Sequence, residues 1–252
     1  MKTMRWTNWT VLLAIGMAAS AMADPAFLLT NDSRSIMYDY QSQTHGYMGE
    51  TRTPDAFGDP WSDQLAGSVT DGVMDLIWDS NQASTVGLTE FDGRNEIRAD
   101  ISPAGKGGPL KATTILSQSL TSLEFEVTEN TEVFFNVDHY RADASLDGHV
   151  EMYFRLGYFS EEKDTLLYNH EVILDHGLEI GAFGSAPIAL TTGNTYFMDI
   201  LLLGSTVVLA PPADLETSAG FAFYNLSIVP EPSTGCALLC LLGVAMVRRR
   251  TV

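Results

Sequence analysis

The chain has 252 residues and is strongly acidic, with 32 aspartate and glutamate residues against 14 lysine and arginine residues and a formal net charge of −18 at pH 7. Residues 24–229 hold nine of the basic and 31 of the acidic residues, so their net charge is 9 − 31 = −22. A surface of this charge repels nucleic acid and anionic membranes, and we expect neither as a partner. Cations and neutral glycans are the candidate partners. The simplest interpretation of the charge is that it keeps the protein soluble.

Residues 1–23 have the three parts of a secretion signal. Two basic residues precede a short apolar run, and Ala21-Met22-Ala23 matches an A-x-A cleavage site. The apolar run is shorter than the ~20 residues that a membrane-spanning helix needs. We therefore expect cleavage between Ala23 and Asp24, which leaves an acidic domain at residues 24–229 and a tail at residues 230–252.

The predicted domain is long enough for one sizeable hydrophobic core. Both cysteines, Cys236 and Cys240, lie in the tail, so the domain forms no disulfide and depends on its core for stability. Residues 24–67 are rich in Asp, Ser, Gly and Pro, and there we expect short strands and long loops.

Beyond residue 120, apolar residues alternate with polar ones, which is the period-two pattern of half-buried β-strands. The alternating segments are 123–128, 133–138, 152–156, 196–200 and 221–224. Glu129 and Asn130 fall between the first two segments, and this turn predicts a hairpin. No helix pattern competes in the second half of the sequence, so we predict an all-β fold.

The segment Leu190-Thr191-Thr192-Gly193-Asn194-Thr195-Tyr196 has the L-x-x-G-x-x-Y spacing of a tyrosine corner. In that motif a tyrosine near the start of a strand bonds the backbone a few residues upstream and fixes a Greek-key crossover. Together with the flanking strands it predicts a single β-sandwich of the jelly-roll or immunoglobulin-like type. The last strand would run from Phe221 to Ile228, directly before the tail.

Sequence signatures of catalysis are absent, since there is no G-x-S-x-G, no H-E-x-x-H and no phosphate-binding glycine motif. His170 and His176 come close in sequence, but six residues of strand separate them by ~20 Å, so we interpret them as exposed strand-edge residues. Glu124 and Glu126 would share one face of a strand, either as a solvated outer face or as part of an acidic groove like that of a glycosidase.

Two acidic segments could supply oxygen ligands to calcium. The first contains Asp92, Asn95 and Glu96 as candidates for a metal site, and the second runs from Asp143 to Gly148. Neither segment matches an EF-hand loop, and Asp-Gly is also ordinary turn chemistry. We therefore predict no obligatory cofactor and keep calcium as the one candidate ion.

Aromatic residues in the polar first half of the chain could bind a glycan, because exposed rings stack on sugar faces while nearby Asp or Asn side chains bond the hydroxyls. These residues are Tyr38, Tyr40, Tyr47, Trp61 and Trp78. Trp78 lies in an apolar stretch, and we expect it in the core.

The tail has three parts in a fixed order. Pro230-Glu231-Pro232 is followed by an apolar run from Gly235 to Val247, and then by Arg248, Arg249 and Arg250. This layout resembles a PEP-CTERM sorting signal. The apolar run is shorter than the ~20 residues of a stable span, and the arginines would stay on the cytoplasmic side. A permanent C-terminal anchor is the alternative.

The resemblance implies a bacterial sorting pathway. Proteins similar in this tail are recognised by exosortase, a membrane protease-transpeptidase, and occur in Gram-negative-type bacteria that often make exopolysaccharide. By this resemblance Pro230, Glu231 and Pro232 would be the recognition element. The apolar run would be a transient membrane segment, and the arginine cluster would be the cytoplasmic stop.

Two classes of function follow. The first is a non-enzymatic protein that is exported to the cell envelope, the outer surface or the extracellular matrix and binds polysaccharide or calcium through one face of the sandwich. The second is a secreted polysaccharide-active enzyme with an acidic cleft. We favour the first, because the sequence has no catalytic signature.

Overall fold

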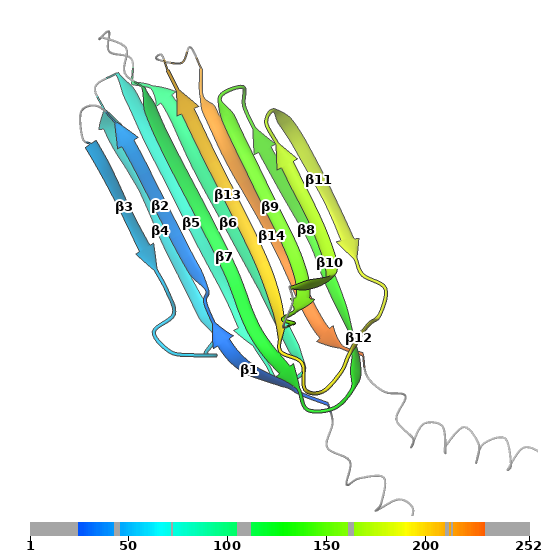
Figure 1. Ribbon diagram of the computed structural model, residues 1–252. Helices are drawn as coiled ribbons and strands as arrows, with labels where there is room; N and C mark the ends of the chain where they lie inside the picture. Colours follow the sequence, from blue (N-terminus) through cyan, green and yellow to red (C-terminus); the bar gives the residue numbers. More distant parts are fainter. Residues whose placement is uncertain are drawn as a thin grey trace, which may run out of the picture. The chain divides into compact units, whose positions relative to one another are not determined.

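The computed structural model describes residues 25–42, 46–71, 73–104, 112–160, 164–209, 212 and 214–229. Residues Ala26–Ile228 form one compact unit, and its described residues make fourteen strands in two antiparallel sheets (Figure 1). The described part of the chain contains no helix, so the all-β prediction is confirmed. The predicted signal peptide and the predicted tail lie outside the described residues.

The first sheet has seven strands: six lie in the order β10-β9-β13-β7-β2-β3, and β1 pairs with β7. Its strands are β1 (Phe27–Asp32), β2 (Ser35–Ser42), β3 (Gly46–Arg52), β7 (Thr113–Val127), β9 (Gly148–Tyr158), β10 (Thr165–Leu174) and β13 (Tyr196–Val208).

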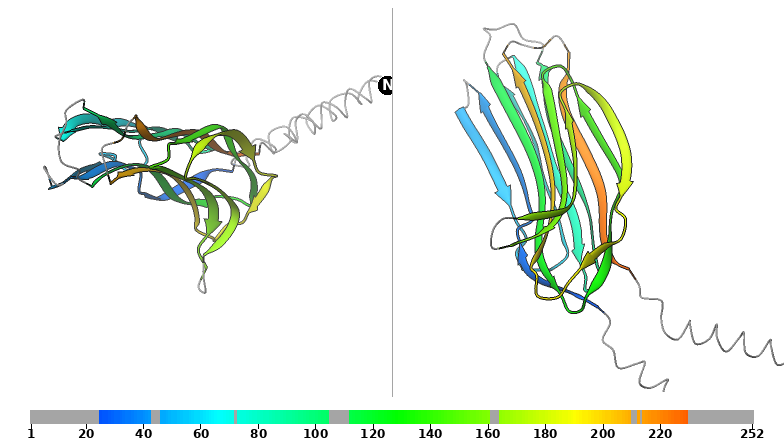
Figure 2. Two further views of the ribbon diagram at one scale, coloured as in Figure 1. Left: turned by 90° about the horizontal axis from the view of Figure 1, so that it is seen from above. Right: turned by 45° about the vertical axis from the view of Figure 1, so that its right-hand side comes forward.

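The second sheet has the order β11-β8-β14-β6-β5-β4, with β12 paired to β8. Its strands are β4 (Trp61–Asp71), β5 (Met74–Val86), β6 (Glu90–Pro103), β8 (Thr131–Ala144), β11 (Gly177–Gly184), β12 (Ile188–Leu190) and β14 (Glu216–Ile228). The two sheets form two layers that pack face to face (Figure 2).

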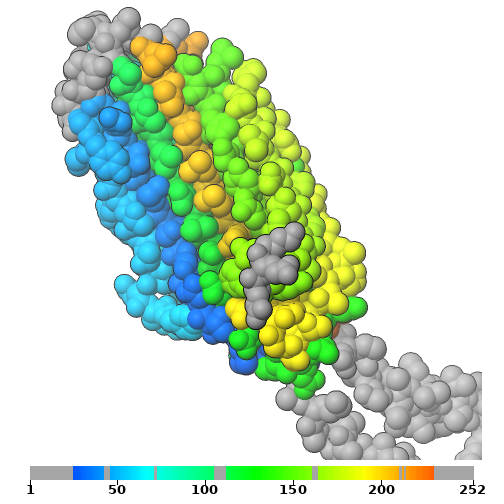
Figure 3. All heavy atoms as spheres, viewed as in Figure 1, coloured from blue at the N-terminus to red at the C-terminus, as the bar shows by residue number. Residues whose placement is uncertain are grey.

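The last two long strands are inserted between earlier ones. β13 lies between β9 and β7 in the first sheet, and β14 lies between β8 and β6 in the second. Segments far apart in the sequence are therefore neighbours, and on the outer face of the first sheet β13, in orange, runs between green β7 and β9 (Figure 3).

The hairpin predicted around Glu129 and Asn130 is wrong. β7 belongs to the first sheet and β8 to the second, so the connection crosses between sheets. β7 pairs with β13, β1 and β2, whereas β8 pairs with β14, β11 and β12. A short polar segment can connect two paired strands as a hairpin, or two strands that lie in different sheets. Only the strands that each one pairs with show which connection is present.

The predicted alternation of side chains is confirmed in β7, β8 and β9. Leu123, Phe125 and Val127 of β7 are buried, and β8 and β9 bury every second side chain over the predicted segments. In β14 the phase is the reverse of the predicted one, because Ala222 and Tyr224 face inward, whereas Phe221 and Phe223 face outward.

The interior contains two apolar cores with polar side chains between them. Along β7 the inner side chains run from Ile115, in the small core, through a polar stretch to Leu123, in the large core. We call the fully buried polar residues between the cores the polar belt; they are Ser80, Gln82, Asn95, Ser117, Ser119 and Thr121.

The polar belt bonds the two sheets to each other. Ser117 Oγ of β7 donates to Asp79 O of β5 at 2.7 Å. Asn95 Nδ2 of β6 donates to Ile200 O of β13 at 3.3 Å. These bonds avoid the ~1–3 kcal/mol that an unpaired buried polar group costs.

The predicted tyrosine corner is present. Tyr196 opens β13 with its ring buried, and its hydroxyl donates to Thr191 O at 3.1 Å and accepts from Thr191 N at 2.6 Å. Gly193, in the intervening turn, has a φ of +86°, which residues with a Cβ rarely adopt. The corner fixes the chain where it passes from β12 of the second sheet to β13 of the first.

Candidate functional site

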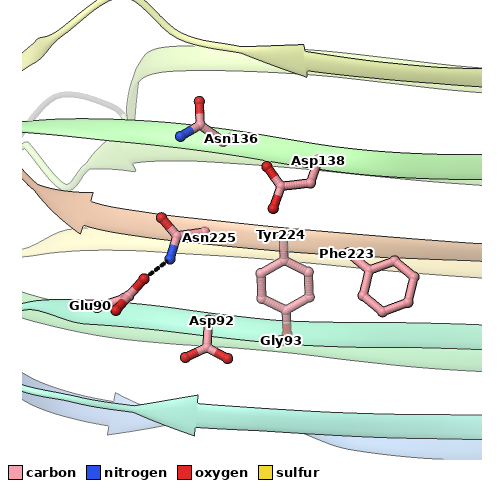
Figure 4. Close-up of a pocket in the computed structure, with 8 residues that line it drawn as sticks. All are labelled: Glu90, Asp92, Gly93, Asn136, Asp138, Phe223, Tyr224 and Asn225. Atoms are coloured by element: carbon pink, nitrogen blue, oxygen red, sulfur yellow. Dashed lines mark hydrogen bonds between the residues drawn. The ribbon is translucent and has the colours of Figure 1, made fainter.

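The outer face of the second sheet carries a hollow of about 370 Å³. It lies over three neighbouring strands, β8, β14 and β6 (Figure 4). Carboxylates, amides and one exposed aromatic ring line it above a glycine and a buried tyrosine. The lining residues are Glu90, Asp92, Gly93, Asn136, Asp138, Phe223, Tyr224 and Asn225.

β8 has a β-bulge beside the hollow, at Asp138. Phe223 pairs with His139 while Tyr224 pairs with Val137, so Asp138 is the extra residue of β8. Both Asp138 and His139 consequently lie exposed on the outer face. The alternation of Val133, Phe135 and Val137 already directs Asp138 outward. The bulge turns His139 outward as well, so that the next inward residue is Tyr140.

The floor of the hollow is tied to the interior. The ring of Tyr224 crosses over Gly93, where an added Cβ would collide with it. Tyr224 is buried, and its hydroxyl shares a hydrogen bond of 2.6 Å with Thr121 of the polar belt. Burial raises the pKa of Tyr224, so the hydroxyl stays neutral.

Three carboxylates face the hollow from two strands. Glu90 accepts a hydrogen bond from Asn225, and Asp92 accepts one from Thr85. Asp138 has no side-chain hydrogen bond to another described residue. Asp92 and Asp138 lie on opposite sides of β14 (Figure 4), so acceptor groups reach an incoming molecule from two directions.

Aromatic rings extend the hollow along β14. Phe223 is 40% exposed, and its ring centroid lies 5.9 Å from that of Phe221. The guanidinium of Arg94, which is paired with Glu96, lies 5.4 Å from the centroid of Phe223. The face thus combines an apolar ring surface with carboxylate and amide groups, a combination suited to a molecule that has hydroxyls and one apolar side.

The predicted calcium ligands do not come together. Residues 92–96 form no turn but lie inside β6, where successive side chains point to opposite faces. Asn95 is 0% exposed in the interior, whereas Asp92 and Glu96 lie on the outer face. Across the described ranges, no group of three or more His, Cys, Asp or Glu side chains is placed to hold a metal ion.

The aromatic residues predicted for glycan contact are dispersed. The ring of Trp78 is buried, which confirms its place in the core, and its centroid lies 4.5 Å from Tyr38 and 5.6 Å from Tyr40. Trp78 and Tyr40 are buried, so neither ring is open to a sugar, and Tyr38 is half-buried. Tyr47 is exposed on β3, and Trp61 is half-buried at the start of β4.

Glu124 and Glu126 share the outer face of β7, where both are half-buried. Glu124 accepts a hydrogen bond of 3.1 Å from Asn31 of β1. Both glutamates belong to the first sheet, whereas the hollow lies on the second. They therefore contribute nothing to the hollow.

The interpretation of His170 as an exposed residue is wrong. It lies on the edge strand β10, but its ring is half-buried, with its centroid 3.9 Å from that of Phe183. The ring packs there because β10 and β11 bring aromatic side chains together at the side of the sandwich. His176 is exposed in the turn between these strands.

A third histidine, His149, lies in a charged cluster that sequence reasoning missed. Its Nε2 is 2.8 Å from Glu151 Oε1 and its Nδ1 is 2.6 Å from Asp175 Oδ1. The hydrogen bond to Glu151 and, to a smaller extent, the hydrogen bond to Asp175 raise the pKa of His149. The spacing of two residues between His149 and Glu151, which share one face of β9, was the available signal.

A buried ion pair lies at the start of β2. Arg34 Nη2 is 2.5 Å from Asp32 Oδ2, and the side chains are 0% and 2% exposed. Arg34 also donates to Ser84 Oγ at 3.0 Å and to Asp59 O at 2.7 Å, while Asp32 accepts from Gly58 N at 3.0 Å. Burial opposes ionisation of Asp32, but the bonds from Arg34 and Gly58 outweigh it and lower the pKa.

A second hollow, of about 460 Å³, lies beside this ion pair and is lined in part by Phe57. Its charged groups, Asp32 and Arg34, already bond each other and neighbouring backbone groups. The hollow over β14 is therefore the better candidate site.

The predicted sorting and cleavage residues lie outside the described residues. They are Pro230, Glu231, Pro232, Arg248, Arg249, Arg250, Ala23 and Asp24. Within the part of the chain that the structure describes, no helix is both long and apolar enough to cross a membrane.

Comparisons with known proteins leave the function open. No family model matches the chain, and no curated protein matches it. Among solved structures, that of infectious bursal disease virus, Gx strain, covers 84% of this chain and 80% of its own at 9% identity, with a TM-score of 0.15. A TM-score this low carries no argument, so function is argued from the site.

Proposed function

We propose that the chain is an exported, non-enzymatic protein of the cell envelope or extracellular matrix of a Gram-negative-type bacterium, and that it holds polysaccharide on the outer face of its second sheet. Sorting would use the PEP-CTERM-like tail, with an exosortase-type protease as partner and transient membrane association. The observation that carries the binding part is the hollow over β8, β14 and β6.

The chemistry of the hollow suits a sugar. The exposed ring of Phe223 can stack on the apolar face of a pyranose, while Asp138 and Asn136 can bond its hydroxyls. The net charge of −22 on residues 24–229 favours a neutral or cationic polymer over an anionic one. Calcium is not included, because the described carboxylates do not converge on one point.

We also propose that the sandwich is of the jelly-roll or immunoglobulin-like type. Two observations support this: β13 and β14 are inserted between strands that precede them in the chain, and a tyrosine corner introduces β13.

The sorting proposal is tested by the intact mass of the protein recovered from its host, with envelope and medium analysed separately. We expect a mass that runs from Asp24 to about Pro230, with or without an added group. A mass that retains Arg250 would instead show a permanent anchor.

The binding proposal is tested by affinity electrophoresis in gels that contain neutral polysaccharides. Phe223→Ala should raise the dissociation constant about fivefold to tenfold, the factor for loss of one stacked ring. Phe159→Ala is the matched control, because Phe159 is 41% exposed but lies outside the hollow. Equal retardation of the wild type and Phe223→Ala on every polymer would contradict the proposal.

A secreted polysaccharide-active enzyme is the second candidate, because Asp92 and Asp138 face one hollow from opposite sides of β14, as paired carboxylates do in glycosidases (Figure 4). Under this alternative, Asp138→Asn would abolish turnover of a polymer while leaving its binding intact. The absence of turnover on a broad polymer panel would exclude it.

A further inference from the structure

The edge strands on the two sides of the sandwich differ in charge. β3 and β4 form one side, and β10 and β11 form the other. On the first side, Arg52 of β3 contacts Glu50 at 2.8 Å and reaches across to Asp63 of β4 at 3.2 Å. Charges on an edge strand discourage pairing with another strand, so this side is protected.

β11 has no such protection. Its outward side chains Leu178 and Ile180 are 55% and 56% exposed. Glu179, between them, is half-buried, and its carboxylate accepts a hydrogen bond of 2.7 Å from Tyr140. No other residue of this strand is ionisable. The free edge of β11 therefore presents unpaired backbone groups beside two exposed apolar side chains, which is a template for another strand.

We propose that β11 pairs in antiparallel fashion with β11 of a second copy, so that the second sheets of two molecules become one continuous sheet. Two-fold symmetry requires one residue of the strand to face itself. Centring on Glu179 would oppose two carboxylates. Centring on Ile180 instead opposes Ile180 to itself, Leu178 to Ala182 and Glu179 to Gly181, so like charges are kept apart and apolar side chains share one face.

The distribution of charge also favours association of two copies through their β11 edges over association through other surfaces. Two domains with a net charge of −22 repel each other across most of their surfaces. The β11 edge carries one carboxylate, which is turned inward and hydrogen-bonded, so approach there opposes few charges. In the register centred on Ile180, the β11 strands of two copies also place apolar side chains opposite apolar side chains. An unrelated partner would need a strand of its own with a matching pattern.

The dimer adds to the proposed function without depending on it. A two-fold axis perpendicular to the joined sheet turns both outer faces of the second sheets in the same direction. Two hollows could then engage one polymer, and such linkage strengthens binding without new contacts. Dimer formation is tested in the absence of polysaccharide, so its failure would leave the binding proposal standing.

The first test is disulfide trapping in the full chain. Cys236→Ser and Cys240→Ser remove both native thiols. Ile180→Cys is then added in one variant and Met48→Cys in another; Met48 is a matched control, because it is 49% exposed on the edge strand β3. Facing Cα atoms of antiparallel strands are ~4.5–5.5 Å apart, within disulfide range. Protein exported by the host is analysed on non-reducing gels.

We expect a covalent dimer for Ile180→Cys, in several-fold excess over Met48→Cys. The register is checked by mixing Leu178→Cys with Ala182→Cys, a pair that should cross-link to each other more than either does to itself. Equal cross-linking at positions 180 and 48 would overturn the proposal.

The second test uses sedimentation of the processed protein without cross-links. The thiol-free chain should show a dimer whose fraction rises with concentration. Ile180→Lys should shift it to monomer, and Met48→Lys should not, while circular dichroism confirms that both retain β-structure. A thiol-free chain that sediments as a monomer at every loading concentration would overturn the proposal.

Discussion

The large core and the polar belt are equally buried, yet they hold the two sheets together by different means. In the large core, aromatic rings fill the space between the sheets, with the centroid of Phe125 5.0 Å from that of Phe27 and 5.2 Å from that of Phe91. In the polar belt, the short side chain of Ser117 reaches a backbone carbonyl of the opposite sheet. Burial alone therefore does not identify the residues that contribute most to stability.

The two regions should differ in the cost of losing a side chain. An apolar side chain contributes its transfer free energy, and its removal leaves a cavity. A belt side chain has exchanged bonds to water for bonds to protein, so its net contribution is near 1 kcal/mol, although an orphaned partner costs more.

The largest effect is expected in the large core. Phe154 is 0% exposed, and its ring packs against that of Phe183. Phe154→Ala should lower the free energy of unfolding by about 3–5 kcal/mol, the range for buried aromatic residues. Urea denaturation followed by tryptophan fluorescence measures the change. A loss below about 1 kcal/mol would show that the large core tolerates cavities.

The buried ion pair tests whether losing a charged partner lowers stability more than losing a neutral residue of the polar belt. Arg34→Met strands the carboxylate of Asp32 and should lower the free energy of unfolding by about 3 kcal/mol, the lower end for a broken buried pair, because the orphaned carboxyl can take up a proton.

The same pair predicts a dependence on pH. Since the pKa of Asp32 is lowered in the folded protein, its contribution is present above the unfolded pKa and is lost as pH falls through the folded one. Acid titration of stability should show this loss in the wild type and a smaller one in Arg34→Met. Identical acid profiles would contradict the assignment.

The polar belt should show a smaller loss. Asn95→Leu keeps the volume but removes the bond to Ile200 O and the acceptor for Thr121 Oγ1. We expect the free energy of unfolding to fall by about 2 kcal/mol. Asn225→Leu, on the outer face of β14, is the control and should change it by less than about 0.5 kcal/mol. A neutral Asn95→Leu would mean that the belt can be replaced by apolar contacts.

The smallest effect is expected at His149. Because Glu151 and Asp175 raise its pKa in the folded protein, its contribution is fully present below the unfolded pKa and is lost as pH rises through the folded one. The amount should be about 0.5 kcal/mol, as for exposed ion pairs. His149→Gln should flatten the pH dependence of stability between about pH 6 and 8. An unchanged slope would contradict this role.

Strands were predictable from sequence where their inner face is apolar, and not where it is polar. Residues 123–127 show clear alternation, because Leu123 and Phe125 face the large core. In the earlier half of the same strand, Leu116 and Leu120 face outward while the polar belt faces inward, so the apolar pattern contradicts the true orientation.

The hollow could have been foreseen only in part. Buried residues in β8 fall at Val133, Phe135 and Val137 and then at Tyr140 and Ala142, so the phase of the alternation shifts at Asp138. This shift indicates a bulge. It does not indicate which strands lie beside the bulge, and β6 reaches the hollow only because β14 is inserted between β6 and β8.

The sequence by itself determined the acidic charge, the all-β class, the alternation over the large core and the tyrosine corner, because each depends on residue types at short, regular spacing. Only the tertiary structure decided that β7 and β8 lie in different sheets and that Asn95 points into the interior, away from Asp92 and Glu96. It also decided that Asp138 and Asp92 face one hollow from opposite sides of β14. These features depend on pairing between strands far apart in the chain, and local propensity carries no information about such pairing.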